Sequence, residues 1–440
     1  MRTPWGHPRR RAGVAAVLAA VLAALLVPPA SAAPAAARPD GHHGTAGGPA
    51  AAPRTVVLDG KDLVRAKARL RAGDPQARRA LRDLVVQADA WLGQGPWTVV
   101  DKDRVPPSGD PHDYFSQAPY WWPGAPRTPD NPQGCPYVQR DGERNPEVDG
   151  LTDHDERGKV FESAYELSLA WYYTGRRAYA EHAARILRTW FVDPETRMNP
   201  NLGNAQAIPC RYDGRAIGII DFSQGFTSLL DATAVLDLGA PGWSAGDRDG
   251  MRIWENGFLD WLVDSDFGKQ EGAAANNHGT FHHMQVAALA AATGRTALAR
   301  ETVAAARAGL IDPQIAADGS QPQELARTRS WHYSTFNLVA FTRLAAVGDH
   351  VGVDLWHHTD TDGASLRRAV DFLLPAATGA GPWPHPELAF HAYAASDVVH
   401  AAADHGDRRA RAALPDLEAP PGGDLWALRP APEQLDGITG

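Results

Sequence analysis

The sequence contains few cysteines and no excess of positive charge. Only two of its 440 residues are cysteine, so it allows at most one internal disulfide. The formal net charge is −9 with histidine neutral, which argues against the general polyanion-binding surface of a nucleic-acid-binding protein. A chain of this charge that binds an acidic sugar polymer needs a locally basic cleft.

Long apolar runs are also missing, except at the N-terminus. Residues 12–27 form an apolar stretch that follows a basic segment and precedes the small residues Ala30, Ser31 and Ala32. This order is typical of a secretory signal peptide, which we predict over residues 1–32. A membrane anchor is the alternative, but the run is shorter than a typical span of ~20 residues. We therefore expect a secreted chain with no membrane association once the signal is cleaved.

No proline-, glycine- or serine-rich linker divides the rest of the chain. Residues 33–54 are rich in alanine, proline, glycine and histidine without an apolar period, which is typical of a disordered leader. Residues 55–414 are predicted to form one large domain, and residues 415–440 a proline- and glycine-rich tail. We expect a monomer.

The two cysteines lie in loop-like stretches. Cys135 and Cys210 each stand next to a proline. In an exported protein they predict one disulfide that joins two loops. Two buried thiols are the alternative.

Apolar residues recur mainly at helical spacing. Predicted helices over 161–174 and 177–191 are separated by Thr174-Gly175, and the turn Thr293-Gly294 separates two more. Glycine directly after the last turn is a common helix stop. The other predicted helices span 76–92, 217–237, 250–264, 283–292, 297–310, 336–347 (ending before Gly348) and 364–374.

Two helical hairpins of the same design predict stacking in series, because one hairpin cannot bury its own apolar face. The expected fold is all-α, an α/α toroid of stacked helical hairpins, and an irregular helical bundle is the alternative. Two long loops, over 104–150 and 192–216, carry many Trp, Tyr, Arg and Asn residues. Long loops in a compact domain are often functional, so we expect these two to wall a groove.

The segment 276–283, Asn-Asn-His-Gly-Thr-Phe-His-His, carries polar residues at a predicted helix start. Amide and imidazole donors near the positive end of a helix dipole suit a carboxylate. Helix capping by Asn277 or Thr280 explains one of these residues. It does not explain Asn276, Asn277 and His278 together.

A second polar segment spans residues 318–334. It contains Arg327, Arg329 and Tyr333, and on a helix either arginine could share a face with the tyrosine. Arginine binds a carboxylate through two parallel hydrogen bonds. Tyrosine can transfer a proton if nearby cations lower its pKa. A surface arginine and a core tyrosine are the alternative.

Together these segments resemble the alginate lyase domain family of polysaccharide lyases. The motifs are Asn-Asn-His-Gly-Thr at 276–280 and Glu-Leu-Ala-Arg-Thr-Arg-Ser-x-x-Tyr at 324–333. Stretches within 113–147 and 193–202 agree with the family, so the resemblance covers roughly residues 80–400. The Asn-Asn-His-Gly-Thr form is closer to relatives that act on glucuronan or mannuronan.

The resemblance implies β-elimination at a uronic acid of a β-1,4-linked polymer, such as alginate, polymannuronate or glucuronan. The C5 proton is removed and the 4-O-linked sugar leaves, after donors neutralise the adjacent carboxylate. Asn277 and Arg327 are the expected neutralisers, with Arg329 as the alternative arginine. His278 is the expected base or a further neutraliser, and Tyr333 the acid and, in a syn elimination, also the base. The scheme requires no metal and no other cofactor.

Further polar and aromatic residues are expected to bind the substrate. Aromatic rings in the first long loop can stack on sugar faces, and an arginine there can meet a second carboxylate. Loop packing is the alternative for these residues. The candidates are Tyr120, Trp121, Trp122, Arg140, Asn276, Arg329 and Gln224.

Three other functions are considered. A glycoside hydrolase on the same fold needs two carboxylates about 5–10 Å apart. Its candidates are Asp153, Glu162, Asp221 and Glu324. Metal-assisted chemistry could use His278, His282 and His283. The spacing of four residues could place His278 and His282 on one helix face, but a third ligand on that face is not obvious. A non-catalytic uronan-binding protein would keep the fold without the chemistry.

Overall fold

The computed structural model describes residues 51–211 and 218–428. The predicted signal peptide, most of the predicted leader and the end of the predicted tail lie outside these residues. No helix in the described part of the chain is long and apolar enough to cross a lipid bilayer. The helices are α1 (Gly60–Ala72), α2 (Pro75–Trp91), α3 (Asp153–Thr174), α4 (Arg177–Leu187), α5 (Ser223–Leu236), α6 (Ala245–Asp264), α7 (Asp266–Gly272), α8 (Asn277–Ala292), α9 (Thr296–Ala306), α10 (Asp312–Gln314), α11 (Pro322–Leu325), α12 (Ser330–Val351), α13 (Leu366–Ala377), α14 (Ser396–Asp404) and α15 (Arg408–Ala413).

The two predicted hairpins are present as α3–α4 and α8–α9. Gly175 ends α3 in the left-handed conformation, with a φ of 74°, and its N–H donates to the carbonyl of Trp171. Gly294 follows α8 with a φ of 82°. Glycine adopts this conformation without the steric cost that a side chain would bring. Both turns therefore lie where the sequence predicted them.

Several helices begin before their predicted starts, and the differences are largest for α3, α8 and α12. The structure adds turns that begin at Asp153 in α3, at Asn277 in α8 and at Ser330 in α12. The added turns are rich in polar residues, which an apolar period does not detect. Residues with candidate chemistry therefore lie inside the helix starts rather than in the loops before them.

The predicted end of a helix before Gly348 is wrong, because α12 continues to Val351. A Cβ atom at position 348 would lie 2.4 Å from the carbonyl oxygen of Val353. Glycine at this position allows a close approach of two chain segments and does not stop the helix.

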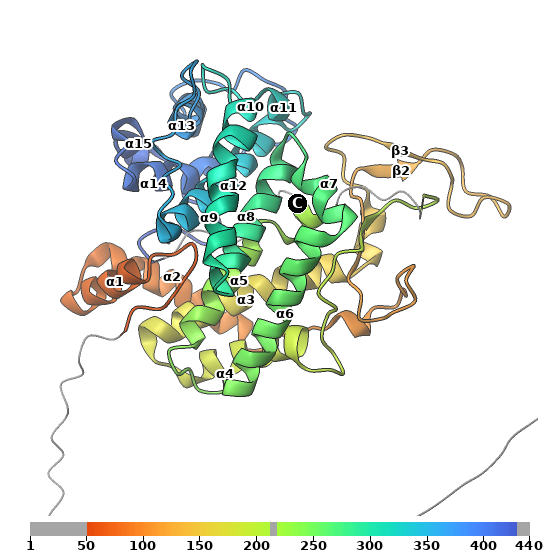
Figure 1. The fold of residues 1–440 in the computed structure, drawn as a ribbon, viewed down its shortest axis with the longest axis horizontal. Helices are drawn as coiled ribbons and strands as arrows, with labels where there is room; N and C mark the ends of the chain where they lie inside the picture. Colours follow the sequence, from red (N-terminus) through yellow and green to blue (C-terminus); the bar gives the residue numbers. More distant parts are fainter. Residues whose placement is uncertain (1–50, 212–217, 429–440) are drawn as a thin grey trace, which may run out of the picture. The chain divides into compact units, whose positions relative to one another are not determined.

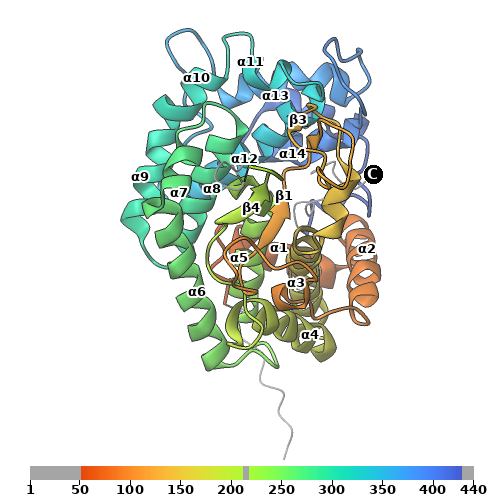
Figure 2. The same cartoon turned by 90° about the vertical axis from the view of Figure 1, so that its right-hand side faces the viewer.

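The inner helices stack side by side in the order α3, α5, α8 and α12. The helices α4 and α9 pack against α3 and α8 as the second halves of the hairpins, and α14 continues the stack beyond α12 (Figures 1 and 2). Both α8 and α12 are buried along most of their lengths, as expected for helices inside a stack. The predicted all-α class with stacked hairpins is confirmed.

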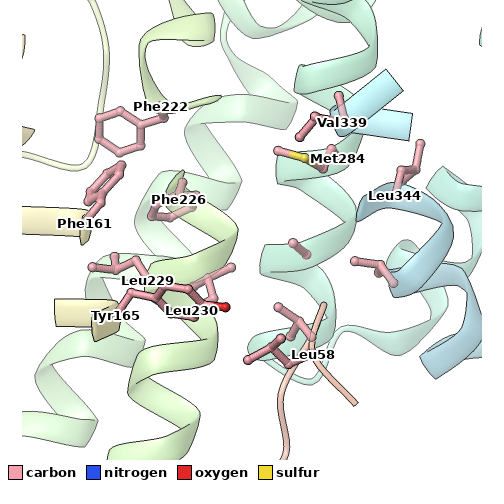
Figure 3. Packing of buried hydrophobic residues seen from close by; sticks show 14 of the residues in the cluster. Leu58, Phe161, Tyr165, Phe222, Phe226, Leu229, Leu230, Met284, Val339 and Leu344 are labelled. Atoms are coloured by element: carbon pink, nitrogen blue, oxygen red, sulfur yellow. The ribbon is translucent and has the colours of Figure 1, made fainter. Parts of the chain in front are cut away.

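Aromatic rings fill the core where α3, α5 and α6 meet. The ring centre of Phe222 lies 5.2 Å from those of Phe161 and Phe226. It lies 5.1 Å from the ring centre of Phe258, and Figure 3 shows Phe161, Phe222 and Phe226 close to one another. Such pairs add about 0.5–1.5 kcal/mol each beyond their buried area. The cluster fixes the segment that precedes α5 against α3.

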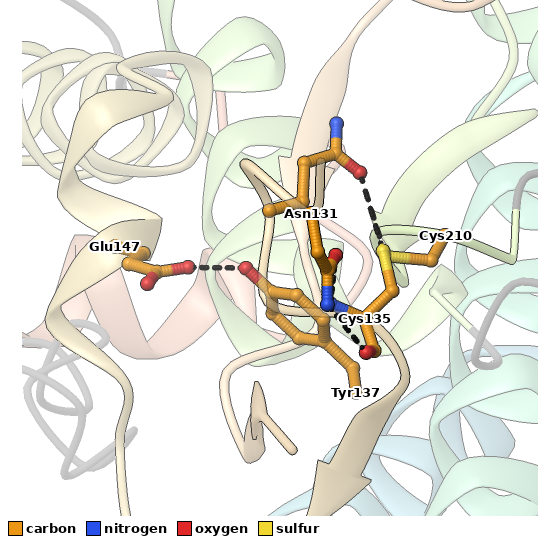
Figure 4. Close-up of a disulfide and its surroundings, with 6 residues drawn as sticks. Asn131, Cys135, Tyr137, Glu147 and Cys210 are labelled. Carbon is orange, nitrogen blue, oxygen red and sulfur yellow. Dashed lines mark hydrogen bonds between the residues drawn. A yellow bond between two sulfur atoms is a disulfide. The ribbon is translucent and has the colours of Figure 1, made fainter. Parts of the chain in front are cut away.

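Short strands and one disulfide organise the long loops. The strands are β1 (Phe115–Gln117), β2 (Trp121–Pro123), β3 (Tyr137–Gln139) and β4 (Asn204–Ala207). β1 pairs in parallel with β4, beside it in Figure 2, and β2 pairs antiparallel with β3 in a hairpin that stands out from the helices in Figure 1. Cys135, just before β3, is bonded to Cys210, and their Cα atoms lie 6.1 Å apart (Figure 4). The predicted disulfide is confirmed, and it joins the two long loops.

Candidate active site

A cavity of about 510 Å³ lies where the inner helices begin. Its helical wall includes residues 276–278, Arg327, His332, Tyr333 and Phe336. Its loop wall consists of residues 118–121, Gln139 and Gln206. Two distant stretches of the chain thus meet at one site. The predicted site residues that line it are Tyr120, Trp121, Asn276, Asn277, His278, Arg327 and Tyr333.

The cavity lies at the N-terminal ends of four helices. His154 is in the first turn of α3, and Asp221 lies just before α5. Asn277 begins α8, and Tyr333 is in the first turn of α12. A helix N-terminus carries roughly half a positive charge from its unpaired N–H groups. The four ends together favour an anion in the cavity, although the whole chain is acidic.

A buried glutamate orients His278. Glu271, on α7, is fully buried, and its Oε1 lies 3.0 Å from Nδ1 of His278. The backbone N–H of Ile220 donates to the same carboxylate at 3.1 Å. Burial lowers the pKa of His278, but the charge of Glu271 and its hydrogen bond outweigh burial, so the pKa lies above its ordinary value. Because Nδ1 is occupied, Nε2 is the ring nitrogen left for chemistry.

Glu324 holds Asn277 in place. The backbone N–H of Asn277 donates to Oε1 of Glu324 at 2.8 Å, and the amide nitrogen donates to Oε2 at 2.7 Å. Both residues are buried, and burial raises the pKa of Glu324 despite these two hydrogen bonds. An amide nitrogen has two hydrogens, so one is left for a group in the cavity. Asn276 caps α8 by accepting from the N–H of His278 at 3.2 Å.

Asp141 holds Arg327 against Tyr333. The Nε and Nη2 atoms of Arg327 donate to Oδ1 of Asp141 at 2.9 and 2.5 Å, and the N–H of Thr328 donates to Oδ2 at 3.0 Å. The guanidinium carbon lies 3.6 Å from the centre of the Tyr333 ring. Burial raises the pKa of Asp141, but the hydrogen bonds from Arg327 and Thr328 outweigh it, so the pKa lies below its ordinary value. Arg327 is therefore a charged group with a fixed orientation.

The hydroxyl of Tyr333 is protonated in the free protein. It donates to the hydroxyl of Tyr120 at 3.0 Å. Burial and then Tyr120 raise the pKa of Tyr333 well above its ordinary value, and the charge of Arg327 opposes them only in part. A pKa lowered by nearby cations, the condition named for proton transfer by this tyrosine, is not found, because desolvation outweighs the single adjacent cation. Tyr333 is suited to donate a proton rather than to remove one.

His332 is a cavity residue that the sequence analysis missed. Its ring stacks on Phe336 with the centres 5.5 Å apart. Burial, followed by the charges of Arg329 and Arg327, lowers the pKa of His332 to about 3. His332 is therefore neutral at ordinary pH, so it can form hydrogen bonds but cannot neutralise a carboxylate.

Several predicted substrate-binding residues are not among those that line the cavity. Successive side chains on β2 alternate between faces, and Trp122 packs beneath Arg140, whose guanidinium carbon lies 4.9 Å from the ring centre. Arg329 is the residue before α12 rather than a helical neighbour of Tyr333, and its Nε lies 3.9 Å from Glu387. The side chain of Gln224 lies outside the described residues. Of the two arginines considered, Arg327 is the one in the cavity.

Two supporting carboxylates were also missed. Asp141 lies in the stretch 113–147 that carries the family resemblance, so a signal for it was present. Glu271 precedes His278 by seven positions and belongs to a separate helix, and no periodicity connects the two. Only the turn between α7 and α8 brings them together.

The other histidines of the Asn-Asn-His segment bond to the backbone. Nε2 of His282 lies 3.2 Å from the carbonyl oxygen of Leu262, and burial lowers the pKa of His282 to about 4. Nδ1 of His283 lies 2.8 Å from the carbonyl oxygen of Gly279. Within residues 51–211 and 218–428 no group of three or more His, Cys, Asp or Glu side chains is placed to hold a metal ion.

The fold and the cavity define a helical protein with a polar site that favours an anionic group, and similar proteins identify its family. The alginate lyase family matches residues 98–383. An alginate lyase from Bacteroides ovatus has a similar structure, with a TM-score of 0.79 and 31% identity over 87% of this chain and 100% of that chain. The chain belongs to the alginate lyase family and is a polysaccharide lyase.

A more distant structure shares the fold. A tyrosine-to-phenylalanine variant of alginate lyase A1-III, complexed with a tetrasaccharide, gives a TM-score of 0.51 at 13% identity over 86% of this chain and 96% of that chain. The A1-III enzyme comes from Sphingomonas species A1. No curated protein matches this chain. These likenesses confirm the predicted α/α toroid.

Proposed function

We propose that this polysaccharide lyase cleaves a β-1,4-linked uronan, alginate or polymannuronate or glucuronan, by β-elimination without a metal. The products carry a 4,5-unsaturated uronate at the new end. The observation that carries the proposal is one cavity lined by Asn277, His278, Arg327 and Tyr333. Two segments that the sequence left far apart supply the donors, the base and the acid that this reaction requires.

The first requirement is to neutralise the uronate carboxylate, because an adjacent negative charge makes the C5 proton a weak acid. The second amide hydrogen of Asn277 and the guanidinium of Arg327 are the donors for this role. Four helix N-termini support them from the same side. Their carboxylate partners, Glu324 and Asp141, keep the donors oriented before the substrate arrives.

The second requirement is proton transfer at C5 and at the leaving oxygen. In its neutral form His278 donates from Nδ1 to Glu271 and keeps a lone pair on Nε2 to accept the C5 proton. The protonated hydroxyl of Tyr333 donates to the 4-O oxygen as that bond breaks. The proton moves from C5 to His278 and the leaving sugar receives one from Tyr333, so the step is balanced.

The substrate class rests on the relatives. The Bacteroides ovatus protein is an alginate lyase by its description, and the A1-III variant holds a tetrasaccharide. A uronan brings one carboxylate per sugar to a cavity in which helix ends and Arg327 favour anions. We therefore propose an anionic polysaccharide as the partner of this chain.

The hydrolase alternative is weaker. Of its candidate carboxylates only Asp221 is among the described residues that line the cavity. Asp221 accepts hydrogen bonds from Tyr114 at 3.2 Å and from Gln206 at 2.6 Å. A carboxylate with these partners holds β1 and β4 together, and the other three candidates are not among the described residues that line the cavity opposite it.

An ultraviolet screen tests the function. The purified protein is incubated with alginate, polymannuronate, polyguluronate, glucuronan and hyaluronan. A rise in absorbance from the new C4–C5 double bond supports a lyase and identifies its substrate. Release of reducing ends without that rise indicates hydrolysis, and binding without either change indicates a non-catalytic uronan-binding protein.

We also propose that the protein is secreted. The disulfide between Cys135 and Cys210 supports this, since such bonds persist mainly in exported proteins. N-terminal sequencing of the protein from the culture medium tests the proposal. A mature chain that begins near Ala33 is expected, and full-length protein retained in the cells contradicts it.

A further inference from the structure

Two tryptophan–arginine pairs lie on opposite faces of β2. The guanidinium carbon of Arg211 is 5.3 Å from the ring centre of Trp121, and that of Arg140 is 4.9 Å from the ring centre of Trp122. Trp121 and Trp122 are consecutive strand residues, so their side chains point to opposite faces. Trp121 lines the cavity and Trp122 does not. Trp121, with Arg211 against its ring, therefore lies on the face of β2 that borders the cavity, and Trp122, with Arg140 against its ring, lies on the opposite face.

The two arginines differ in their charge partners. Arg140 lies 4.0 Å from Glu143. Arg211 has no ion pair with any residue in the described ranges 51–211 and 218–428. It is exposed, and it is an arginine at the loop wall of an otherwise acidic chain. Arg211 is not among the described residues that line the cavity, but its guanidinium lies against the ring of Trp121, which does line it.

The position of Arg211 is fixed by the loop wall itself. It follows Cys210, whose disulfide to Cys135 ties this segment to the start of β3. Its N–H donates to the carbonyl of Ile208 at 3.0 Å. Ile208 belongs to a small apolar cluster against which Trp121 also packs. The aromatic ring and the guanidinium are thus held together by one cross-linked unit.

We propose that Trp121 and Arg211 form a subsite for a second uronate unit, next to the unit that reacts. This rests on the proposed function, because the ligand is the neighbouring sugar of the same uronan. One face of the sugar packs on the ring of Trp121, and its carboxylate pairs with the guanidinium of Arg211. A subsite of this kind favours polymers that carry one carboxylate on each successive sugar.

The test compares matched variants of the two arginines. Arg211→Gln removes the charge beside Trp121, Arg211→Lys keeps the charge without the planar fork, and Arg140→Gln removes the same group beside Trp122 on the opposite face. Substrates are purified oligouronides of increasing length from a uronan that the wild type cleaves. Arg211→Gln is expected to raise KM about five- to tenfold for the longer oligomers, with kcat and the shortest substrate unchanged. Arg211→Lys is expected to lie in between, and Arg140→Gln to resemble the wild type.

Equal losses in both glutamine variants, or none in either, would overturn the subsite, because general attraction of a polyanion does not distinguish the two faces. Calorimetry then measures how tightly oligomannuronate and oligoglucuronate bind to the same variants. These affinities distinguish a failure of the subsite from a failure of the proposed function. If no uronan is cleaved but Arg211→Gln alone binds the oligomers more weakly, the subsite stands and the lyase activity does not. If cleavage is normal and Arg211→Gln binds oligomers like the wild type, the subsite is wrong and the proposed function stands.

Discussion

The two walls of the cavity are built by different means. The helical wall belongs to α8 and α12, which are buried within the stack, and its polar groups are fixed by the buried carboxylates of Glu271 and Glu324. The loop wall rests on a two-stranded hairpin, a disulfide and a small apolar cluster. The proposed donors, base and acid are thus placed mainly by the main core, and the residues of the proposed second subsite are placed by a cross-link. We expect changes in the helical wall to lower turnover and changes in the loop wall to weaken binding.

The largest expected effect is that of Tyr333→Phe. Loss of the hydroxyl removes the proposed acid, so kcat falls about a hundred- to ten-thousand-fold while the fold is kept. Ultraviolet assays measure the rate, and thermal unfolding followed by circular dichroism checks the fold. The matched variant is Tyr120→Phe, which removes the hydrogen-bond partner from the loop wall. If Tyr120→Phe costs as much turnover as Tyr333→Phe, the division between the walls fails.

Glu271→Gln comes next, with a loss on the order of a hundredfold. The charge of Glu271 raises the pKa of His278, so its removal lowers that pKa. If neutral His278 is the base, the acidic limb of the pH–rate profile moves to lower pH. If protonated His278 is a neutraliser, the alkaline limb moves to lower pH instead. An unchanged profile contradicts both roles.

The same pKa shift links Glu271 to stability. The pKa of His278 is higher in the folded chain than the value of about 6.5 in the unfolded chain. Protonated His278 therefore stabilises the fold below about pH 6.5, and this stabilisation is lost as pH rises through the folded value. Denaturant unfolding at several pH values measures it. Glu271→Gln is expected to flatten this dependence, and a steeper one contradicts the assignment.

A smaller effect, about tenfold on kcat, is expected for Asp141→Asn, which weakens a contact between the two walls. Arg327 is then no longer held flat against Tyr333. The pKa of Asp141 is depressed in the folded chain, so its ion pair stabilises the protein above the unfolded value of about 3.9 and is lost as pH falls through the folded value. The control is Asp149→Asn, which removes an exposed ion pair with Arg144 in the same loop. Equal kinetic losses in both variants contradict a specific role for Asp141.

The smallest effect on turnover is expected for Cys135→Ser. The disulfide closes a loop of 75 residues, and its removal costs roughly 2–4 kcal/mol of stability. The proposed base and acid lie on the other wall, so we expect kcat to stay near the wild-type value while KM for long substrates rises severalfold. Cys210→Ser and chemically reduced wild type should match it. A loss of kcat comparable to that of Glu271→Gln would show that the loop wall positions the reacting groups.

The helical wall was largely predictable from the sequence. The period of the apolar residues predicted the helices, and the glycine turns predicted the two hairpins. The polar run at 276–278 and the pair Arg327 and Tyr333 could be identified as site residues because helix capping explains only one of them. Their roles stay predictions.

The supporting carboxylates and the loop wall were less predictable. Glu271 acts on His278 across a turn whose geometry no local pattern specifies. Trp121 and Trp122 looked equivalent in the sequence, and only the pairing of β2 with β3 assigns them to different faces. The raised pKa of Tyr333 could not be predicted from the sequence, because burial depends on the whole fold and not on the neighbouring residues in the chain.

The loop after β3 touches the segment before α12 so closely that it constrains how both can evolve. Gly142 has a φ of 77°, and a Cβ atom there would lie 2.3 Å from Oγ1 of Thr328. The hydroxyl of Thr328 also donates to the carbonyl of Asp141 at 2.7 Å. A side chain at position 142 would require a smaller residue or a shift at position 328. The two positions should therefore vary together among descendants of this gene. A lineage that gains a larger residue at 142 while keeping threonine at 328 would have to move this loop out of reach of Arg327.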